Sequence, residues 1–111
     1  MLDFLTDNEL ATDIIENENE FVVHLMLPGF RKSEVSIKTK REQLIIKGKR
    51  TENDENNYIR KNSYFGEFTK KYVLPDIVDK NSISAKYEYG VLIVNIPKDV
   101  EKNKTSEIII K

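Results

Sequence analysis

Apolar and polar residues alternate most clearly near the end of the chain, between residues 83 and 97. Ile83, Ala85 and Tyr87 alternate with polar residues, which is the period of a β-strand with one buried face. Gly90 then supplies the positive φ that a tight turn needs. The run 91–96 that follows is almost wholly aliphatic, and it predicts a strand shielded from water on both faces. The pattern therefore indicates a β-hairpin in the middle of a sandwich.

The same alternation recurs along the rest of the chain. It predicts further strands over 12–16, 20–27, 35–40, 43–49 and 69–74. In the second of these, four apolar residues share one face: Phe21, Val23, Leu25 and Leu27. Turn signals come roughly every ten residues, and no segment has convincing helical spacing. These features predict an all-β fold, an antiparallel β-sandwich of the immunoglobulin-like kind with about eight short strands.

Three segments lie outside this regular pattern. Residues 1–11 form a short arm that is long enough for at most a transient helical turn. Residues 12–97 form the domain, and residues 98–111 form a charged tail that closes with Ile108, Ile109 and Ile110. This triplet forms either a last strand of the chain's own sheet or an anchor for another subunit. The polar insert 50–63 is longer than an ordinary hairpin loop, so it is either disordered or functional. Within this insert, Tyr58, Ile59 and Arg60 could form a short strand that pairs with another sheet.

Composition limits the possible classes of protein. The chain has 111 residues, which is one domain, with 39% hydrophobic and 33% charged residues. No apolar run approaches the length of a membrane span, and the first residues lack the pattern of a secretory signal, so we expect a cytoplasmic protein without membrane contacts. The chain has no cysteine, which excludes disulfides, thiolate catalysis and cysteine-ligated zinc. Its net charge is −1, but all charged residues among the first 30 are acidic, which reflects solvated strand faces or a contact between subunits.

Candidate catalytic and ligand-binding residues are few. His24 is the one histidine and has no second metal ligand nearby in the sequence, so we expect a structural role. Asp76 and Asp79 flank a turn, where aspartate caps backbone amides. The glycines serve turns or bulges, since no phosphate-binding loop occurs: Gly48, Gly66 and Gly90. The basic stretch 31–50 lacks the interleaved aromatic residues that stack on bases. We therefore expect no enzyme activity, metal, cofactor or nucleic acid.

Several short motifs, in the right order, resemble the α-crystallin domain of small heat-shock proteins. Ala85 to Leu92 has the form A-x-x-x-x-G-V-L, and Leu27-Pro28-Gly29-Phe30 resembles the first half of the prokaryotic and plant domain. Residues 65–75, F-G-x-F-x-K-x-Y-x-L-P, are similar to the stretch before the last hairpin. The Ile108-Ile109-Ile110 triplet is similar to the I-x-I anchor of that family's tail.

This resemblance implies an ATP-independent holdase that binds partly unfolded client proteins and prevents their aggregation. The family assembles into dimers and larger homo-oligomers. It implies that the long loop, around Tyr58, Ile59 and Arg60, joins the sheet of a partner subunit. It also implies that Ile108 and Ile110 insert into a groove of a neighbouring subunit. By position, four residues would line that groove: Val35, Ile37, Ile83 and Ala85.

The chain departs from the family pattern at two places. Lys70 stands where the family usually has arginine, and it lacks the planar fork that arginine uses for bidentate pairing. The N-terminal arm is short for the family, as in a minimal member or a trimmed chain, and three of its apolar residues are expected to contact clients: Leu2, Phe4 and Leu5. The alternative function is a monomeric adaptor or co-chaperone, built on the same sandwich, that docks one defined partner.

Overall fold

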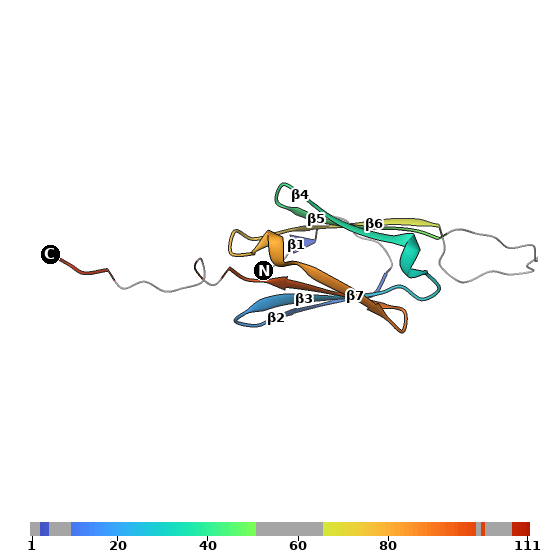
Figure 1. Ribbon diagram of the computed structural model, residues 1–111, viewed down its shortest axis with the longest axis horizontal. Helices are drawn as coiled ribbons and strands as arrows, with labels where there is room; N and C mark the ends of the chain where they lie inside the picture. The colour runs from blue at the N-terminus through green and yellow to red at the C-terminus, as the bar shows by residue number, and fades with distance from the viewer. Residues whose placement is uncertain (1–2, 5–9, 51–65, 100, 102–107) are drawn as a thin grey trace, which may run out of the picture.

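Two antiparallel four-stranded sheets pack face to face in this protein (Figure 1). The computed structural model describes residues 3–4, 10–50, 66–99, 101 and 108–111, with only the backbone at 3–4. The first sheet has the strand order β1-β6-β5-β4, and the second has the order β2-β3-β8-β7. The strands are β1 Asp3–Phe4, β2 Thr12–Glu16, β3 Glu20–Met26, β4 Val35–Lys40, β5 Gln43–Lys49, β6 Glu67–Val73, β7 Ser84–Glu88 and β8 Val91–Pro97. Two 3₁₀ turns, η1 Lys32–Glu34 and η2 Lys80–Ser82, precede β4 and β7, and the predicted all-β sandwich is confirmed.

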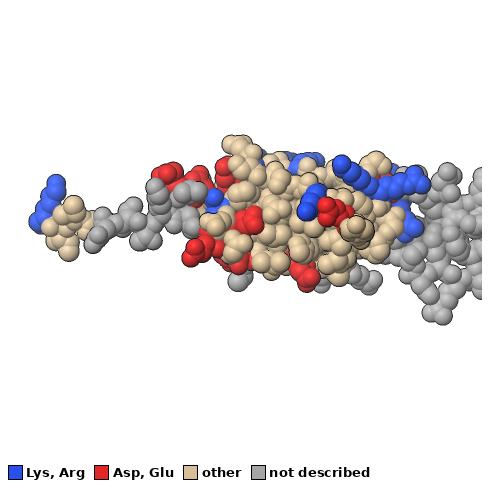
Figure 2. Space-filling view, turned by 60° about the horizontal axis from the view of Figure 1, so that its bottom comes forward, with Lys and Arg blue, Asp and Glu red and all other residues tan. Residues whose placement is uncertain are grey.

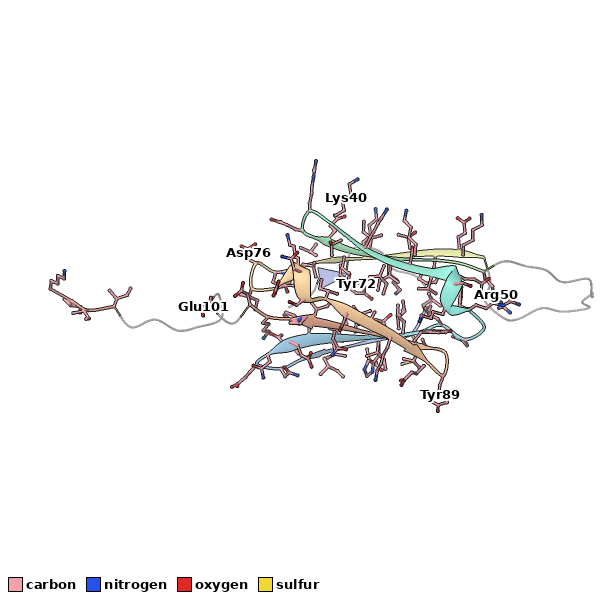
Figure 3. All side chains as sticks on the ribbon, viewed as in Figure 1. Lys40, Arg50, Tyr72, Asp76, Tyr89 and Glu101 are labelled. Atoms are coloured by element: carbon pink, nitrogen blue, oxygen red, sulfur yellow. The ribbon has the colours of Figure 1, made fainter. Side chains whose placement is uncertain are left out.

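The core lies between the sheets and is built by alternate residues of the central strands. On β3 and just beyond it, the four residues predicted to share a face are all fully buried: Phe21, Val23, Leu25 and Leu27. Leu44, Ile46, Phe68 and Tyr72 meet them from β5 and β6. Figure 3 shows Tyr72 between the two sheets. Strict alternation therefore placed the core residues of β3 correctly, because side chains on a strand point to opposite faces in turn, whereas on β5 Ile45 is buried as well as Leu44 and Ile46.

The β7–β8 hairpin forms where the alternation predicted it, but its burial was predicted incorrectly. β8 lies inside its sheet, between β3 and β7, whereas β7 is an edge strand. Leu92, Val94 and Ile96 are buried, while the residues between them on β8 are only half-buried. Ala85 on β7 is exposed. A sandwich has two layers, so the outer face of each sheet is left without a packed layer, however apolar its sequence.

Gly48 does not serve a turn or a bulge, as the sequence had suggested. It lies within β5 and pairs with Phe68 on β6, and an added Cβ atom would lie 2.0 Å from the Cε1 atom of the Phe68 ring. Phe68 packs edge-on against Phe30, with the ring centroids 5.3 Å apart. Gly48 is therefore a site of close approach, where the missing side chain makes room for an aromatic ring.

The first residues of the chain contribute a short edge strand. Asp3 pairs with Val73 and Phe4 pairs with Tyr72, so β1 extends the first sheet beside β6. The transient helical turn that we expected for the arm is therefore wrong at these two residues, whose backbone is extended. The arm's other predicted client-binding residues, Leu2 and Leu5, lie outside the described residues.

Lys98 fastens the start of the tail to the turn between β2 and β3. Its Nζ donates hydrogen bonds to Glu16 Oε2 at 3.1 Å and to the Asn17 carbonyl oxygen at 2.7 Å. The same ammonium lies 5.0 Å from the centre of the Phe21 ring. On the face shown in Figure 2, acidic side chains gather at this end of the sandwich, and lysines and arginines gather toward the other end. The tail therefore leaves the domain from its acidic end.

Candidate functional site

A groove lined by aliphatic and polar side chains runs between β4 and β7, which are edge strands of the two sheets. Its first hollow has a volume of about 210 Å³ and is lined by Lys32, Val35, Ile37, Ala85, Lys86, Tyr87 and Leu92. Its second hollow has a volume of about 340 Å³ and is lined by Ile37, Lys38, Thr39, Leu44, Lys80, Ile83, Ser84 and Ala85. Ile37 and Ala85 line both hollows, so the two lie next to each other along the same pair of strands.

The structure brings together the four residues predicted to line the groove. Val35, Ile37 and Ala85 meet in the first hollow, and Ile83 joins Ile37 and Ala85 in the second. Ala85 has a small side chain, is exposed, and lies on an edge strand, so it fills little of the space between β4 and β7. Val35 and Ile37 are accordingly half-buried, unlike the fully buried residues between the central strands.

Tyr87 holds one wall of the groove in place. Its hydroxyl oxygen lies 2.8 Å from the Leu27 carbonyl oxygen and 2.7 Å from that of Phe30, and its single proton can be donated to either one. Burial raises the pKa of the Tyr87 hydroxyl, and the negative charge of Glu34 raises this pKa further. The sequence placed Tyr87 on the same face as Ala85 but gave no sign of its partners, which lie about 60 residues earlier in the chain.

Four lysine side chains line the groove, and the sequence pattern did not predict them there. Lys32 and Lys86 line the first hollow, and Lys38 and Lys80 line the second; all four are exposed. The ammonium of Lys86 lies 3.8 Å from the Glu88 carboxylate, with both side chains more than half exposed. The groove thus combines aliphatic side chains with positively charged ones. Each of the four lysines lies on a different element, η1, β4, η2 or β7, so no local sequence motif predicts the group.

The tail isoleucines are strongly exposed. Ile108, Ile109 and Ile110 are 86%, 82% and 95% exposed, and none of the described tail residues 108–111 belongs to a strand. Figure 1 shows the C-terminal end lying away from the two sheets. Within this chain, the described part of the tail therefore forms no last strand of either sheet.

A second exposed apolar feature lies on β2, the other edge strand of the second sheet. Ile14 is 41% exposed and Ile15 is 46% exposed, although the register places Ile14 beside the fully buried Val23. An edge strand has unpaired backbone groups on one side and can be extended by a strand from another chain. The loop strand predicted at Tyr58, Ile59 and Arg60 lies outside the described residues.

Lys70 has the most deeply buried charged side chain among the described residues. It is 1% exposed and shares the core-facing side of β6 with Phe68 and Tyr72. At the position where the resembling family usually has arginine, this chain therefore has an ammonium group that is shielded from solvent within the single chain.

The structure shows where the candidate polar and metal-ligating side chains of the described residues lie. They contain no group of three or more histidine, aspartate or glutamate residues that could hold a metal ion. Asp79 acts as a cap, as predicted, because its carboxylate accepts hydrogen bonds from the Asn81 amide at 3.1 Å and the Ser82 hydroxyl at 2.7 Å. His24 is half-buried in the middle of β3. No helix in the described part of the chain is long and apolar enough to cross a membrane.

Comparison with known proteins finds relatives of a single family along nearly the whole chain. The model of the Hsp20/alpha crystallin family matches residues 13–111. Small heat shock protein C4 of Rickettsia felis is 36% identical over 100 residues, covering 87% of this chain and 61% of that protein. The 17.4 kDa class III heat shock protein of Arabidopsis thaliana is 34% identical over 115 residues, covering 93% of this chain and 74% of that protein.

A solved structure agrees with these relatives. The chain superposes on a small heat-shock protein from Xylella fastidiosa with a TM-score of 0.77 and 30% identity, covering 92% of this chain and 94% of that one. The chain spans about three fifths of the length of its Rickettsia felis relative C4. The sandwich, its motifs and these matches agree, and the chain belongs to the Hsp20/alpha crystallin family.

Proposed function

We propose that this protein is a chaperone that acts by binding, without ATP, and that it keeps partly unfolded client proteins from aggregating in the cytoplasm. The observation that carries the proposal is that one chain has both a groove with aliphatic side chains between β4 and β7 and exposed isoleucines in its tail. A groove of this kind accepts extended apolar segments, whether they come from another subunit or from a client.

In the proposed assembly, the tail of one subunit docks in the groove of a neighbour. Side chains two residues apart on an extended segment point to the same side and are about 7 Å apart. Ile108 and Ile110 would therefore enter the two hollows, while Ile109 would point away from the floor. A loop strand around Tyr58, Ile59 and Arg60 would extend the β2 edge of a partner and cover Ile14 and Ile15.

The energetics of a single docked tail are close to balanced. Burying two isoleucine side chains contributes about 1.5–3 kcal/mol each. Ordering three tail residues costs about 1–2 kcal/mol each. One tail contact is therefore weak and reversible, and a stable oligomer needs several contacts at once through effective concentration. This balance allows subunits to exchange and exposes grooves to clients.

The chaperone proposal is tested with a heat-labile client enzyme, whose aggregation is followed by light scattering without ATP. We expect an equimolar amount of the protein to suppress the scattering. A lack of suppression, together with a monomeric mass, would favour the alternative of an adaptor that docks one defined partner.

Tail docking is tested by the double substitution Ile108→Ala with Ile110→Ala. We expect the mass measured by light scattering to fall, because both hollows lose their occupant. Ile109→Ala is the matched control, since it removes an equally exposed isoleucine that would point away from the groove, and it should leave the mass unchanged. An unchanged mass in the double variant would contradict docking between subunits.

A further inference from the structure

The outer side of the first sheet gathers basic residues from three strands. Residues that pair across strands share one face of a sheet, so Lys38 on β4 and Lys71 on β6 both lie beside Ile45 on this side. The register places five lysines and one glutamate on this basic face: Lys38, Lys40, Lys47, Lys49, Lys71 and Glu67. The carboxylate of Glu67 lies 3.5 Å from the Lys49 ammonium and offsets that charge. Figure 3 shows nitrogen-tipped side chains along this side of the sheet, with Lys40 at one end.

The basic face ends in a hollow beside the turn between β4 and β5. The volume of this turn hollow is about 790 Å³, more than twice that of either groove hollow. Its lining residues are Lys40, Arg41, Glu42, Gln43, Ile45, Lys71, Val73 and Lys80. Lys80 also lines a hollow with Asp76, Asp79 and Asp99, which offset its charge, and the register places Asp3 of β1 beside Val73. Lys40, Arg41 and Lys71 still outnumber the carboxylates nearest to them, and Lys38 adjoins them on β4.

Arg41 occupies a turn position that favours other residues. It is the first of two residues between the paired Lys40 and Gln43, and its φ is 56°. Two-residue hairpin turns need a positive φ at this position, where glycine, asparagine and aspartate are preferred. Arginine therefore does not help the turn to form, but its side chain lines the hollow beside Lys40.

We propose that the turn hollow and the basic face beside it bind a linear polyphosphate, that is, a chain of linked phosphate groups. Lys40, Arg41 and Lys71 hold one part of the chain in the hollow. The remainder crosses the sheet past Lys38 to Lys47, which lies four residues beyond Gln43, or about 14 Å along β5. This binding is independent of tail docking and of client binding.

The side chains of the basic face favour this ligand over other polyanions. Lysine binds phosphate as a point charge, without the geometry of a base or a sugar. Proteins that bind single-stranded nucleic acids add aromatic residues that stack on bases, and the strand register places no aromatic residue on the described part of this face. Surfaces that bind membranes add apolar side chains that enter the lipid. Here Ile45 is only 5% exposed and Val73 is half-buried.

Binding of fluorescently labelled inorganic polyphosphate to the full chain, followed by anisotropy, tests the site. We expect Lys40→Gln with Arg41→Gly to weaken binding about tenfold at low salt, since one exposed ion pair changes an affinity by at most about fivefold. The slope of log affinity against log salt concentration should become shallower by about 1.4, because two phosphate contacts are lost. Glycine fits the positive φ of residue 41, so the variant should resist urea at least as well as the unmodified chain, and weaker binding cannot come from unfolding.

A second adjacent pair of basic residues supplies the matched control. Arg31→Gln with Lys32→Gln removes the same two charges from exposed positions outside the turn hollow, and it should change the affinity by less than about twofold. Lys47→Gln tests the path across the sheet. It should weaken binding of the long chain about threefold and leave the binding of tripolyphosphate, which reaches only the hollow, unchanged.

Competition separates polyphosphate from the other sources of phosphate. Single-stranded RNA with the same number of phosphates, and vesicles that contain phosphatidylglycerol, should each displace the labelled polyphosphate less well than unlabelled polyphosphate does. Better displacement by RNA or by vesicles would overturn the proposal in favour of a nucleic acid or a membrane. A lack of polyphosphate binding, or equal losses in the Lys40/Arg41 and Arg31/Lys32 double variants, would overturn the site itself. Each of these results leaves the proposed chaperone function untouched, because client aggregation is measured separately.

Discussion

Replacing Gly48 by alanine sets two physical effects against each other. The backbone of Gly48 has no positive φ, so alanine fits its conformation, and losing a glycine from a strand should stabilise the fold by about 0.5–1 kcal/mol. The Phe68 ring opposes this gain. The new Cβ would lie 2.0 Å from Cε1, 2.6 Å from Cζ and 2.8 Å from Cδ1 of this ring. The sign of the change in stability therefore shows which effect dominates.

The clash should dominate. Carbon atoms in contact normally lie about 3.5–4.0 Å apart, so the ring would have to move by about 1.5 Å. Phe68 is 5% exposed and packs edge-on against Phe30, which leaves it little room to move. Overpacking a core typically costs about 1–3 kcal/mol, and this contact belongs at the upper end of that range. After subtracting the gain from removing glycine, the expected loss of unfolding free energy is about 2 kcal/mol.

Urea unfolding followed by circular dichroism measures this loss, with all variants at one protein concentration because assembly alters apparent stability. The control is Phe68→Leu, which creates space at the same place. In a double-mutant cycle, Gly48→Ala should cost at least about 1 kcal/mol less when Phe68→Leu is present. If Gly48→Ala leaves stability unchanged or raises it, or if the cycle shows no coupling, the close-approach explanation is wrong.

Three further predictions concern tyrosine, lysine and an edge strand. Burial raises the pKa of Tyr72 and Tyr87, so their neutral forms stabilise the fold below pH 10, and this stability is lost as the pH rises through the folded-state pKa values. The unfolding free energy should therefore fall above pH 10. The fall should be smaller in the variant with both tyrosines changed to phenylalanine. Lys98→Met removes two hydrogen bonds made by a nearly buried ammonium, so it should lower the unfolding free energy measured in urea by about 2 kcal/mol. The control Lys47→Met, at an exposed position, should lower it by less than about 0.5 kcal/mol. Ile14→Lys places a charge on the β2 edge, and it should lower the mass of the assembly measured by light scattering if a partner strand covers that edge. An unchanged mass would argue against strand exchange at β2.

The alternation of residues was sufficient to predict all the described strands except β1, and much of the core. Phe21, Val23 and Leu25 alternate strictly and are all fully buried, because a strand with one apolar face has only one stable way to lie on a core. The residues expected to line the groove were also placed together, although that expectation came from family resemblance and not from the pattern. Tail docking and loop exchange remain predictions.

Tertiary structure decided which strands are edges and what surrounds them. Ala85 was predicted on a buried face but is exposed, because alternation defines the two faces of a strand and not whether a neighbour covers them. Gly48 has an ordinary strand conformation, and its need for glycine comes from a ring 20 residues later in the chain. The groove's lysines and the carbonyl partners of Tyr87 likewise come from distant segments. Such features arise only when the order of strands in the sheets brings those segments together, since local spacing contains no record of that order.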